Sequence, residues 1–319
     1  MKRQIILLLG PTAVGKTDVA CMLQDRLRGH LPTRLISVDS TLVYRGMDIG
    51  SAKPTPAQLR AHPHDLIDIR DPQETYTAAD FVVDADECVR AALAAGEVPI
   101  IVGGTMLYAK RFVEGIAQLP QANPELRAAL QAELTQRGGL ALHAELAAID
   151  PAAAANIHPQ NPQRLLRALE VIRLTGRPIS QQWQELNSPT AVQRLDAQVT
   201  TWAIVPDDRK GLHQRIAQRF DAMLAAGFEQ ELQTLAQDPS IPADLPAMRA
   251  VGYRQGLQYL AGAIDAESFR EQTIAATRRL AKRQLTWLRR WADLHTLYWG
   301  DADKLSATIK RQIESRMDV

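Results

Sequence analysis

Eight consecutive residues near the start of the chain have the types and spacing of a phosphate-binding loop. They read GPTAVGKT and meet the pattern G-x-x-x-x-G-K-[ST] in full. In such a loop the backbone N–H groups point inward, and the helix that follows adds a partial positive charge. The lysine reaches phosphate oxygens, and the last hydroxyl can bind Mg²⁺. The residues predicted to bind phosphate are Gly10, Pro11, Thr12, Ala13, Val14, Gly15, Lys16 and Thr17.

The motif does not identify the ligand that carries the phosphates. An ATPase or GTPase also needs a second strand that ends in an acidic residue and helps to hold Mg²⁺. The apolar run Val98–Val102 ends instead in Gly103 and Gly104, and the run Leu35–Val38 ends in Asp39 within ISVDSTLVYRGMDIGSAKP. Neither run resembles a motif that orients water. Hydrolysis is therefore a poor fit, although phosphate binding is strongly indicated.

Short apolar runs alternate with helical patterns over the first part of the chain. Because the runs are apolar throughout, they predict strands of a parallel sheet that is covered on both faces. The fold class expected is therefore α/β, a P-loop NTPase-like parallel sheet flanked by helices. The predicted strands are Ile5–Leu9, Leu35–Val38, Leu66–Ile69, Val98–Val102 and Val199–Val205, and the predicted helices include Lys16–Arg28 and Tyr76–Ala95.

The pattern changes after Leu119-Pro120. From Asn123 to about Trp183 only short amphipathic helices are indicated, so we expect an inserted all-helical domain. The predicted organisation is a discontinuous catalytic core (1–119 and 199–300), a helical insertion (120–198) and a polar C-terminal tail (301–319).

The composition is that of an ordinary globular protein. Hydrophobic residues make up 46% of the 319 residues, and charged residues make up 23%. No apolar run approaches the ~20 residues that span a bilayer, and the two cysteines form no CxxC pair, so we expect a cytoplasmic protein without membrane or zinc. The net charge is +1, but Leu245–Arg290 holds nine Lys or Arg against three acids. This segment would suit a polyanion, or it is simply a solvated basic helix face.

Longer blocks carry a specific resemblance. The chain resembles the tRNA dimethylallyltransferase family from residue 10 to about residue 290. The blocks are GPTAVGKT, LISVDSTLVYRGMDIGSAKP, HDLIDIRDP, PIIVGGTMLY, HPQNPQRLLRALEV, HQRIAQRFDAMLAAGFEQE, AMRAVGYRQ and TRRLAKRQLTWLRR.

The resemblance implies a reaction and its partners. A dimethylallyl group would leave dimethylallyl diphosphate and join the exocyclic amine of the adenosine just 3′ of the anticodon of tRNA. The phosphate loop and a Mg²⁺ held partly by Thr17 would then stabilise the departing diphosphate. The implied partners are the anticodon stem-loop of tRNA and the allylic diphosphate, and the protein is expected to act as a monomer.

The resemblance also assigns roles to single residues. Asp39 would be the general base, since a carboxylate can take a proton from the amine; it could instead cap its loop or bind Mg²⁺ through water. Thr105 would contact the reacting adenosine, although its position also suits a helix N-cap. Arg219 would reach the diphosphate, or lie on the surface of its helix.

Further residues are expected to touch tRNA. Arginines suit phosphate contacts or stacking on unpaired bases, and each could equally face solvent. Tyr253 could stack on a base or pack in the core, and the role of the basic segment Glu271–Arg290 stays open. The predicted tRNA-binding residues are Asp39, Ser40, Thr41, Leu42, Thr105, Arg127, Gln163, Arg164, Leu165, Leu166, Arg167, Arg249, Ala250, Val251, Gly252, Tyr253 and Arg254.

Three other functions remain as alternatives. A small-molecule kinase would share the fold, but the chain shows no lid rich in arginine. An RNA-binding ATPase would need the missing metal-binding acid. A prenyltransferase that acts on free adenine nucleotides would not need the basic segment or the helical insertion.

Overall fold

The computed structural model describes residues 3–116, 119–185 and 189–317. The chain forms two compact units. Residues 1–114 and 190–319 make up the core unit, and residues 115–189 make up the insertion unit. The insertion unit therefore begins five residues before, and ends nine residues before, the 120–198 expected from the sequence. We describe each unit by itself.

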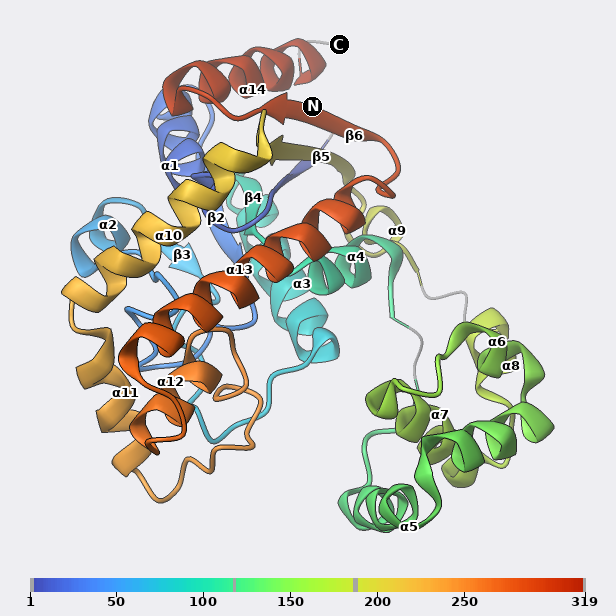
Figure 1. Ribbon diagram of the computed structural model, residues 1–319. Helices are drawn as coiled ribbons and strands as arrows, with labels where there is room; N and C mark the ends of the chain where they lie inside the picture. Colours follow the sequence, from blue (N-terminus) through green and yellow to red (C-terminus); the bar gives the residue numbers. More distant parts are fainter. Residues whose placement is uncertain (1–2, 117–118, 186–188, 318–319) are drawn as a thin grey trace. The chain divides into compact units, whose positions relative to one another are not determined.

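A single six-stranded sheet organises the core unit, and all its described pairings are parallel (Figure 1). The order of the strands across the sheet is β3-β2-β4-β1-β5-β6. The predicted P-loop-like α/β fold is confirmed. The strands are β1 (Gln4–Leu9), β2 (Thr33–Val38), β3 (His64–Asp65), β4 (Val98–Gly103), β5 (Gln198–Val205) and β6 (Leu294–Tyr298).

The central strands are apolar because both of their faces are covered. Every residue from Ile5 to Leu9 is at most 1% exposed, as expected for a strand in the middle of a parallel sheet. The third predicted strand was wrong. It was placed at Leu66–Ile69, but Leu66 and Asp68 have φ of 64° and 55°, which extended strands do not adopt, and β3 ends at Asp65.

Helices surround the sheet (Figure 1). The helix predicted at Tyr76–Ala95 begins later, because Thr77 caps it and forms a capping box with Asp80. The helices of the core unit are α1 (Lys16–Leu27), α2 (Pro56–Ala61), α3 (Ala78–Ala94), α4 (Met106–Glu114), α9 (Ala191–Leu195), α10 (Arg209–Ala225), α11 (Phe228–Gln237), α12 (Tyr253–Leu260), α13 (Ala266–Leu288) and α14 (Ala302–Met317).

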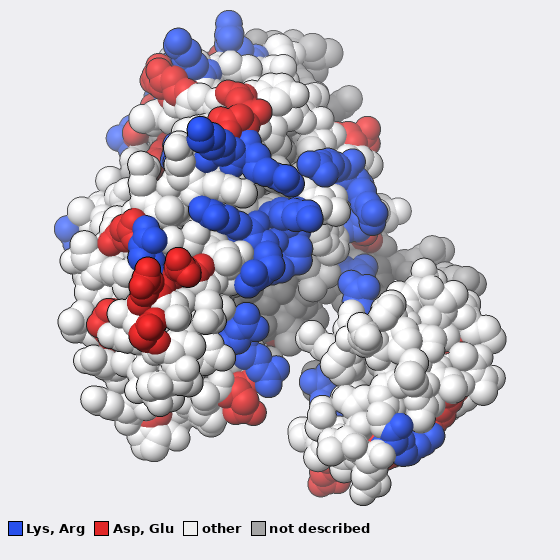
Figure 2. Space-filling view, in the orientation of Figure 1, with Lys and Arg blue, Asp and Glu red and all other residues white. Residues whose placement is uncertain are grey.

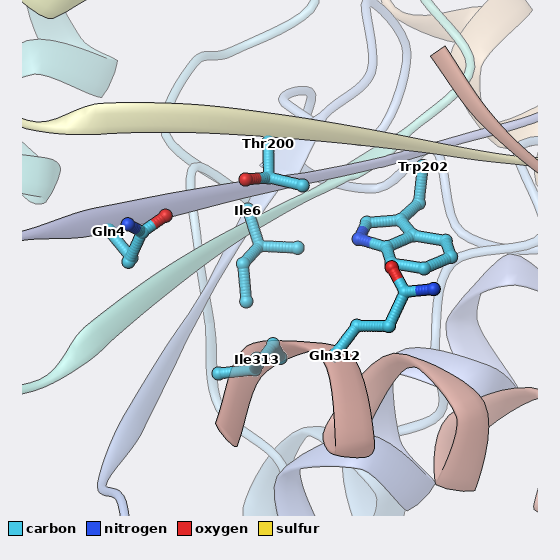
Figure 3. Close-up of a pocket in the computed structure, with 6 residues that line it drawn as sticks. All are labelled: Gln4, Ile6, Thr200, Trp202, Gln312 and Ile313. Carbon is cyan, nitrogen blue, oxygen red and sulfur yellow. The ribbon is translucent and has the colours of Figure 1, made fainter. Parts of the chain in front are cut away.

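The C-terminal segment is part of the core unit, although the sequence suggested a separate tail at 301–319. Helix α14 packs against α1, where Arg26 donates a hydrogen bond to Ser306 Oγ at 2.9 Å and forms an ion pair with Asp303. Ile309 and Ile313 on this helix are buried. Between this helix and strands β1 and β5 lies a small cavity, and Ile6 and Trp202 are among the residues that line it (Figure 3).

The insertion unit is entirely helical in its described part. Leu130 and Leu142 of α5, with Leu165 and Leu169 of α7, form the centre of its own apolar core. Gly138 bends α5 because its φ of 77° is not helical. The helices are α5 (Pro124–Ile149), α6 (Pro151–Asn156), α7 (Pro162–Thr175) and α8 (Ile179–Glu185).

The helix that follows the insertion belongs to the core unit. Arg194 of α9 donates to both carboxylate oxygens of Asp86 in α3, at 2.8 and 3.0 Å, and also to the carbonyl of Phe112 in α4. A nearly buried ion pair of this kind fixes α9 against α3. Within the described ranges of the chain, no helix combines the length and apolarity needed to cross a membrane.

The sheet is tightest where β2 and β4 end. Val38 and Gly103 are register partners, and a Cβ added to Gly103 would lie 2.3 Å from the Val38 carbonyl oxygen. We predict that Gly103→Ala lowers the free energy of unfolding by about 1–3 kcal/mol or more, because backbone must move to accept the methyl group. Urea denaturation measures this change. Gly300→Ala is the control, since its nearest contact would be 3.9 Å; equal stability of the two variants would contradict the prediction.

Candidate active site

Three loops of chemical interest meet at one edge of the sheet. The phosphate loop follows β1, Asp39 follows β2, and Thr105 follows β4. Because β2, β4 and β1 are parallel neighbours, their carboxyl ends lie at the same edge. Ligands of open α/β sheets bind at this edge. The sheet order thus brings together the residues that the sequence suggested for chemistry.

The phosphate loop has the geometry of an anion cradle. Gly15 has φ of 82°, a conformation that allows the loop to turn into α1 and that side chains disfavour. The N-terminus of the twelve-residue α1 then begins at Lys16, with its first amides unpaired within the helix. The Lys16 amine donates a hydrogen bond to the Pro11 carbonyl at 2.8 Å, so it folds back over the loop.

Positive charge is concentrated on this loop. Burial, with the nearby cation of Arg219, lowers the pKa of Lys16 to about 7, and the carboxylate of Asp39 partly opposes this shift. The pKa of Arg219 is also lowered, first by burial and then by Arg215, while Asp39 again acts in the other direction. Lys16, Arg219 and Asp39 therefore share one weakly solvated site. An anion with several charges would relieve the repulsion between its cations.

Arg219 lies close to the phosphate loop rather than on the open surface of its helix. This residue lies on α10, and its guanidinium points to the Ser51 carbonyl at 3.5 Å rather than into solvent. Arg215, one turn earlier, stacks on Trp299 with its guanidinium 4.5 Å from the ring centroid. A Cβ on Gly15 would lie 3.7 Å from Arg215 Nη2, so this second arginine also reaches the phosphate loop. Sequence reasoning missed Arg215.

Asp39 uses one carboxylate oxygen to shape its own loop. Oδ1 accepts hydrogen bonds from the backbone N–H of Thr41 at 2.8 Å and of Leu42 at 3.3 Å. Within the described residues, no protein group donates to Oδ2. The loop-capping role is therefore real, and it leaves the second oxygen available to accept a proton from a ligand.

Thr105 joins two of the loops. Its Oγ1 accepts from the Ser40 N–H at 3.0 Å and lies 3.3 Å from Ser40 Oγ, while its own N–H donates to the Val38 carbonyl. The hydroxyl thus bonds the loop after β2, and no described N–H of α4 donates to it. This arrangement holds Asp39 next to the end of β4.

A partly buried hydrogen-bond network supports the segment that carries Ser51. Glu231 on α11 accepts hydrogen bonds from three successive amides, of Asp48, Ile49 and Gly50, at 2.6–3.1 Å. It also accepts from the Tyr253 hydroxyl at 2.7 Å. The Tyr253 ring is fully buried, so the predicted stacking of this ring on an RNA base is wrong and its packing role is correct. Nothing in the local sequence marked Glu231 as a partner of residues 48–50.

The predicted tRNA contacts near α12 differ in exposure. Arg249 and Arg254 are exposed, and Ala250 and Val251 are half-buried, whereas Gly252 is buried. Within the loop after β2, Ser40 is exposed, and Thr41 and Leu42 are half-buried. The exposed side chains are available to a ligand.

In the insertion unit a buried carboxylate organises the predicted contacts. Glu170 is 0% exposed and accepts from Arg127 at 3.1 Å and from Arg167 at 2.7 Å. Burial alone would raise the pKa of Glu170, but the bonds from Arg167 and from the Asn123 N–H outweigh it and lower the pKa. Arg127 and Arg167 are thus ion-paired rather than simply solvated.

The other residues of the insertion unit that were predicted to bind tRNA lie partly at the surface and partly in the core. Gln163 and Arg164 are exposed at the start of α7, and Leu166 is half-buried. Leu165 is fully buried in the core of the insertion unit, so a contact between its side chain and tRNA is excluded in this structure.

A basic face lies on α10 and α13 (Figure 2). No acidic residue occurs from 209 to 219 on α10, or from 272 to 290 on and after α13. Arg278 and Arg209 lower the pKa of His213, after burial, so the cations of the two helices are close together. The exposed basic residues of this face are Arg209, Lys210, Arg278, Arg279, Lys282, Arg283, Arg289 and Arg290.

The low pKa of Lys16 gives a prediction for anion binding. At pH 8 the free amine is mostly neutral, and a bound diphosphate should restore its proton because the opposite charges attract. We expect pyrophosphate binding to take up about one more proton in the native protein than in Lys16→Arg, whose guanidinium is always charged. Calorimetric titration in two buffers of different ionisation enthalpy counts these protons. Equal counts for the two proteins would show that Lys16 is already charged.

Comparisons with known proteins show which family this chain resembles. Residues 42–291 match the family model described as IPP transferase. The tRNA dimethylallyltransferase of Chromohalobacter salexigens is 52% identical over 302 residues, which are 95% of this chain and 93% of that protein. The protein of the same name from Thiobacillus denitrificans is 52% identical over 292 residues, 92% of this chain and 90% of that protein.

Solved structures show the same relationship. The tRNA isopentenylpyrophosphate transferase of Bacillus halodurans is 35% identical, with a TM-score of 0.71 and coverage of 100% of this chain and 97% of that one. A eukaryotic dimethylallyltransferase described as acting on tRNA is 21% identical, with a TM-score of 0.80 and coverage of 98% and 77%, and it shares the fold. With a matching family model over most of its length and close relatives over nearly all of it, this chain belongs to the IPP transferase family.

Proposed function

We propose that this protein transfers a dimethylallyl group from dimethylallyl diphosphate to the exocyclic amine of the adenosine 3′ of the anticodon in tRNA. Membership of the IPP transferase family, and relatives named tRNA dimethylallyltransferase, support prenyl transfer to tRNA. One structural observation carries the chemistry: the carboxylate of Asp39 lies beside the cations of a phosphate loop, Lys16 and Arg219.

The phosphate loop suits a leaving diphosphate. When the bond between the allylic carbon and the diphosphate oxygen breaks, its electron pair stays on that oxygen and negative charge increases there. The amides at the start of α1, with Lys16 and Arg219, place positive charge where this charge develops. Arg215 extends the same positive field from the next turn of α10.

The residues at the loop fit a Mg²⁺ that is held mainly by substrate. In the described part of the chain, no group of three His, Cys, Asp or Glu side chains could hold a metal by itself. Mg²⁺ commonly binds through one or two protein groups, waters and phosphate oxygens. The Thr17 hydroxyl, next to Lys16, would be the direct ligand. A bound Mg²⁺ would neutralise part of the diphosphate charge.

Asp39 is suited to activate the amine. The lone pair of an exocyclic amine is delocalised into the base, so the amine is a weak nucleophile. Oδ2 of Asp39 can accept one of its N–H hydrogen bonds and take the proton as the new C–N bond forms. The bonds that Oδ1 receives from Thr41 and Leu42 hold the carboxylate in place for this step, and Thr105 fixes the same loop.

The adenosine must leave the stack of its anticodon loop to reach Asp39, which costs a few kcal/mol. Contacts with the surrounding RNA would offset this cost. We propose that Arg249, Arg254 and the basic face on α10 and α13 bind the phosphates in the core unit. Gln163 and Arg164 would contribute from the insertion unit, with Arg127 and Arg167 presented by Glu170. One chain carries all of these residues, so we propose that a monomer is active.

A transfer assay tests the proposal against its alternatives. We predict that the protein, given Mg²⁺ and labelled dimethylallyl diphosphate, places the label on undermodified tRNA and not on AMP or ATP in the same reaction. The tRNA recovered by gel electrophoresis, digested to nucleosides, should carry the label on a single adenosine. Label on AMP alone would favour the free-nucleotide prenyltransferase, and phosphate transfer from ATP to a small hydroxyl compound would favour the kinase.

The second prediction concerns the base. Asp39→Asn should reduce kcat by about 10²–10⁴-fold, because the amide cannot take a proton. Pyrophosphate affinity, measured at pH 6 where Lys16 is protonated in both proteins, should change only a few-fold. Asp265→Asn is a matched control, since Asp265 also accepts a backbone hydrogen bond, from Ser268 at 2.8 Å, but caps α13. A near-normal kcat for Asp39→Asn would remove Asp39 from the role of base.

A further inference from the structure

A single side-chain amide connects two loops of the site. Gln284 lies on α13, and its side chain is buried between the phosphate loop and the turn after β4. Its Oε1 accepts a hydrogen bond from the Thr12 N–H at 2.9 Å, and its Nε2 donates to the Gly104 carbonyl at 2.9 Å. The two loops lie 272 and 180 residues away along the chain.

The two bonds require both halves of an amide. A glutamine offers a donor and an acceptor on one planar group, whereas a glutamate side chain would offer only acceptors and a methionine neither. The bond to the Gly104 carbonyl is buried and the bond from the Thr12 N–H is partly buried, so solvent would replace a lost partner poorly, least of all at Gly104. The residue type at position 284 therefore matters more than its size.

The turn after β4 is shaped to admit this amide. A Cβ on Gly104 would lie 2.6 Å from Gln284 Nε2 and 3.6 Å from Lys16 Nζ. The missing side chain of Gly104 thus leaves the space in which the glutamine amide and the lysine amine both pack. A methyl group there would displace the amide, which is the movable neighbour.

Gln284 also determines where one amide of the cradle points. The N–H of Thr12 is directed at Gln284, so this N–H is not directed at the phosphate site, and the loop is held at its third residue. Lys16 is held by the adjacent Pro11 carbonyl. Movement of Thr12 would move this carbonyl, and with it the amine that must meet the diphosphate.

We propose that Gln284 is a positioning residue for the diphosphate: its amide sets the shape of the phosphate loop and the place of Lys16 without contacting the substrate. The proposal deepens the proposed function, on which it rests for the identity of the allylic diphosphate. It makes a separate claim about pyrophosphate, which can be tested without tRNA or catalysis.

The experiment compares Gln284→Met, Gln284→Glu and Gly104→Ala in the full-length protein. Calorimetry gives the Kd of pyrophosphate, and thermal unfolding gives the Tm. We expect Gln284→Met and Gly104→Ala each to weaken pyrophosphate binding about tenfold or more. Gln284→Glu keeps the acceptor for Thr12 but loses the donor to the Gly104 carbonyl and adds a negative charge beside Lys16, so it should lower the Tm and also weaken pyrophosphate binding.

Two controls separate positioning from general stability. Gln182→Met removes an equally buried glutamine of the insertion unit, which donates to Thr175 Oγ1 and to the Arg177 carbonyl. It should lower the Tm and leave the Kd of pyrophosphate unchanged. The double variant Gly104→Ala/Gln284→Met should bind pyrophosphate about as well as either single variant, because both substitutions remove the same contact.

The outcomes distinguish this inference from the proposed function. In the transfer assay, Gln284→Met should raise the KM for dimethylallyl diphosphate and leave the KM for tRNA nearly unchanged. Weakened pyrophosphate binding would support the positioning role even if the native protein transferred no prenyl group. Native pyrophosphate affinity in Gln284→Met or Gln284→Glu, with only a lower Tm, would overturn the role, as would additive losses in the double variant.

Discussion

The structure depends on one electrostatic constraint at the carboxyl edge of the sheet. Lys16 and Arg219 lie close together where water is largely excluded, and Asp39 is the carboxylate that partly balances them. Burial and mutual repulsion both disfavour their charged forms, so this site favours a ligand with negative charge. A ligand with linked phosphates supplies this negative charge. The same cations would also stabilise a diphosphate group as it leaves an allylic carbon.

This constraint explains how the sheet and the distant helices work together. The parallel order β2-β4-β1 places Asp39, Thr105 and the phosphate loop at adjacent strand ends. The cations come from α10, much later in the chain, and the loop is fastened by Gln284 on α13. A site of this kind must be assembled from distant segments. One loop cannot supply both the backbone amides that surround the phosphates and the side chains that face those amides across the site.

Carboxylates that accept several hydrogen bonds, one half-buried and one fully buried, play a second organising role away from the phosphate loop. Glu231 orders the backbone of residues 48–50 and holds the Tyr253 hydroxyl. In the insertion unit, Glu170 pairs with Arg127 and Arg167. A buried carboxylate must keep its hydrogen-bond donors, because leaving its charge without them is costly. It therefore fixes the direction of the donor groups around it. Arg127 and Arg167, which are proposed to bind RNA, are therefore oriented before any RNA arrives.

The sequence alone determined the phosphate loop, the parallel α/β core and the helical insertion. The reason is that these depend on local signals, namely glycine spacing, apolar runs and helix caps. The family resemblance indicated Asp39 and Thr105, and their positions at the ends of predicted strands agreed with it. Only the tertiary structure decided that Tyr253 and Leu165 are core residues, that α14 belongs to the core unit, and that Arg215, Glu231 and Gln284 serve the site. The burial of a side chain, and its pairing with a segment far away in the sequence, result from tertiary packing. The residues next to it in the sequence therefore do not reveal them.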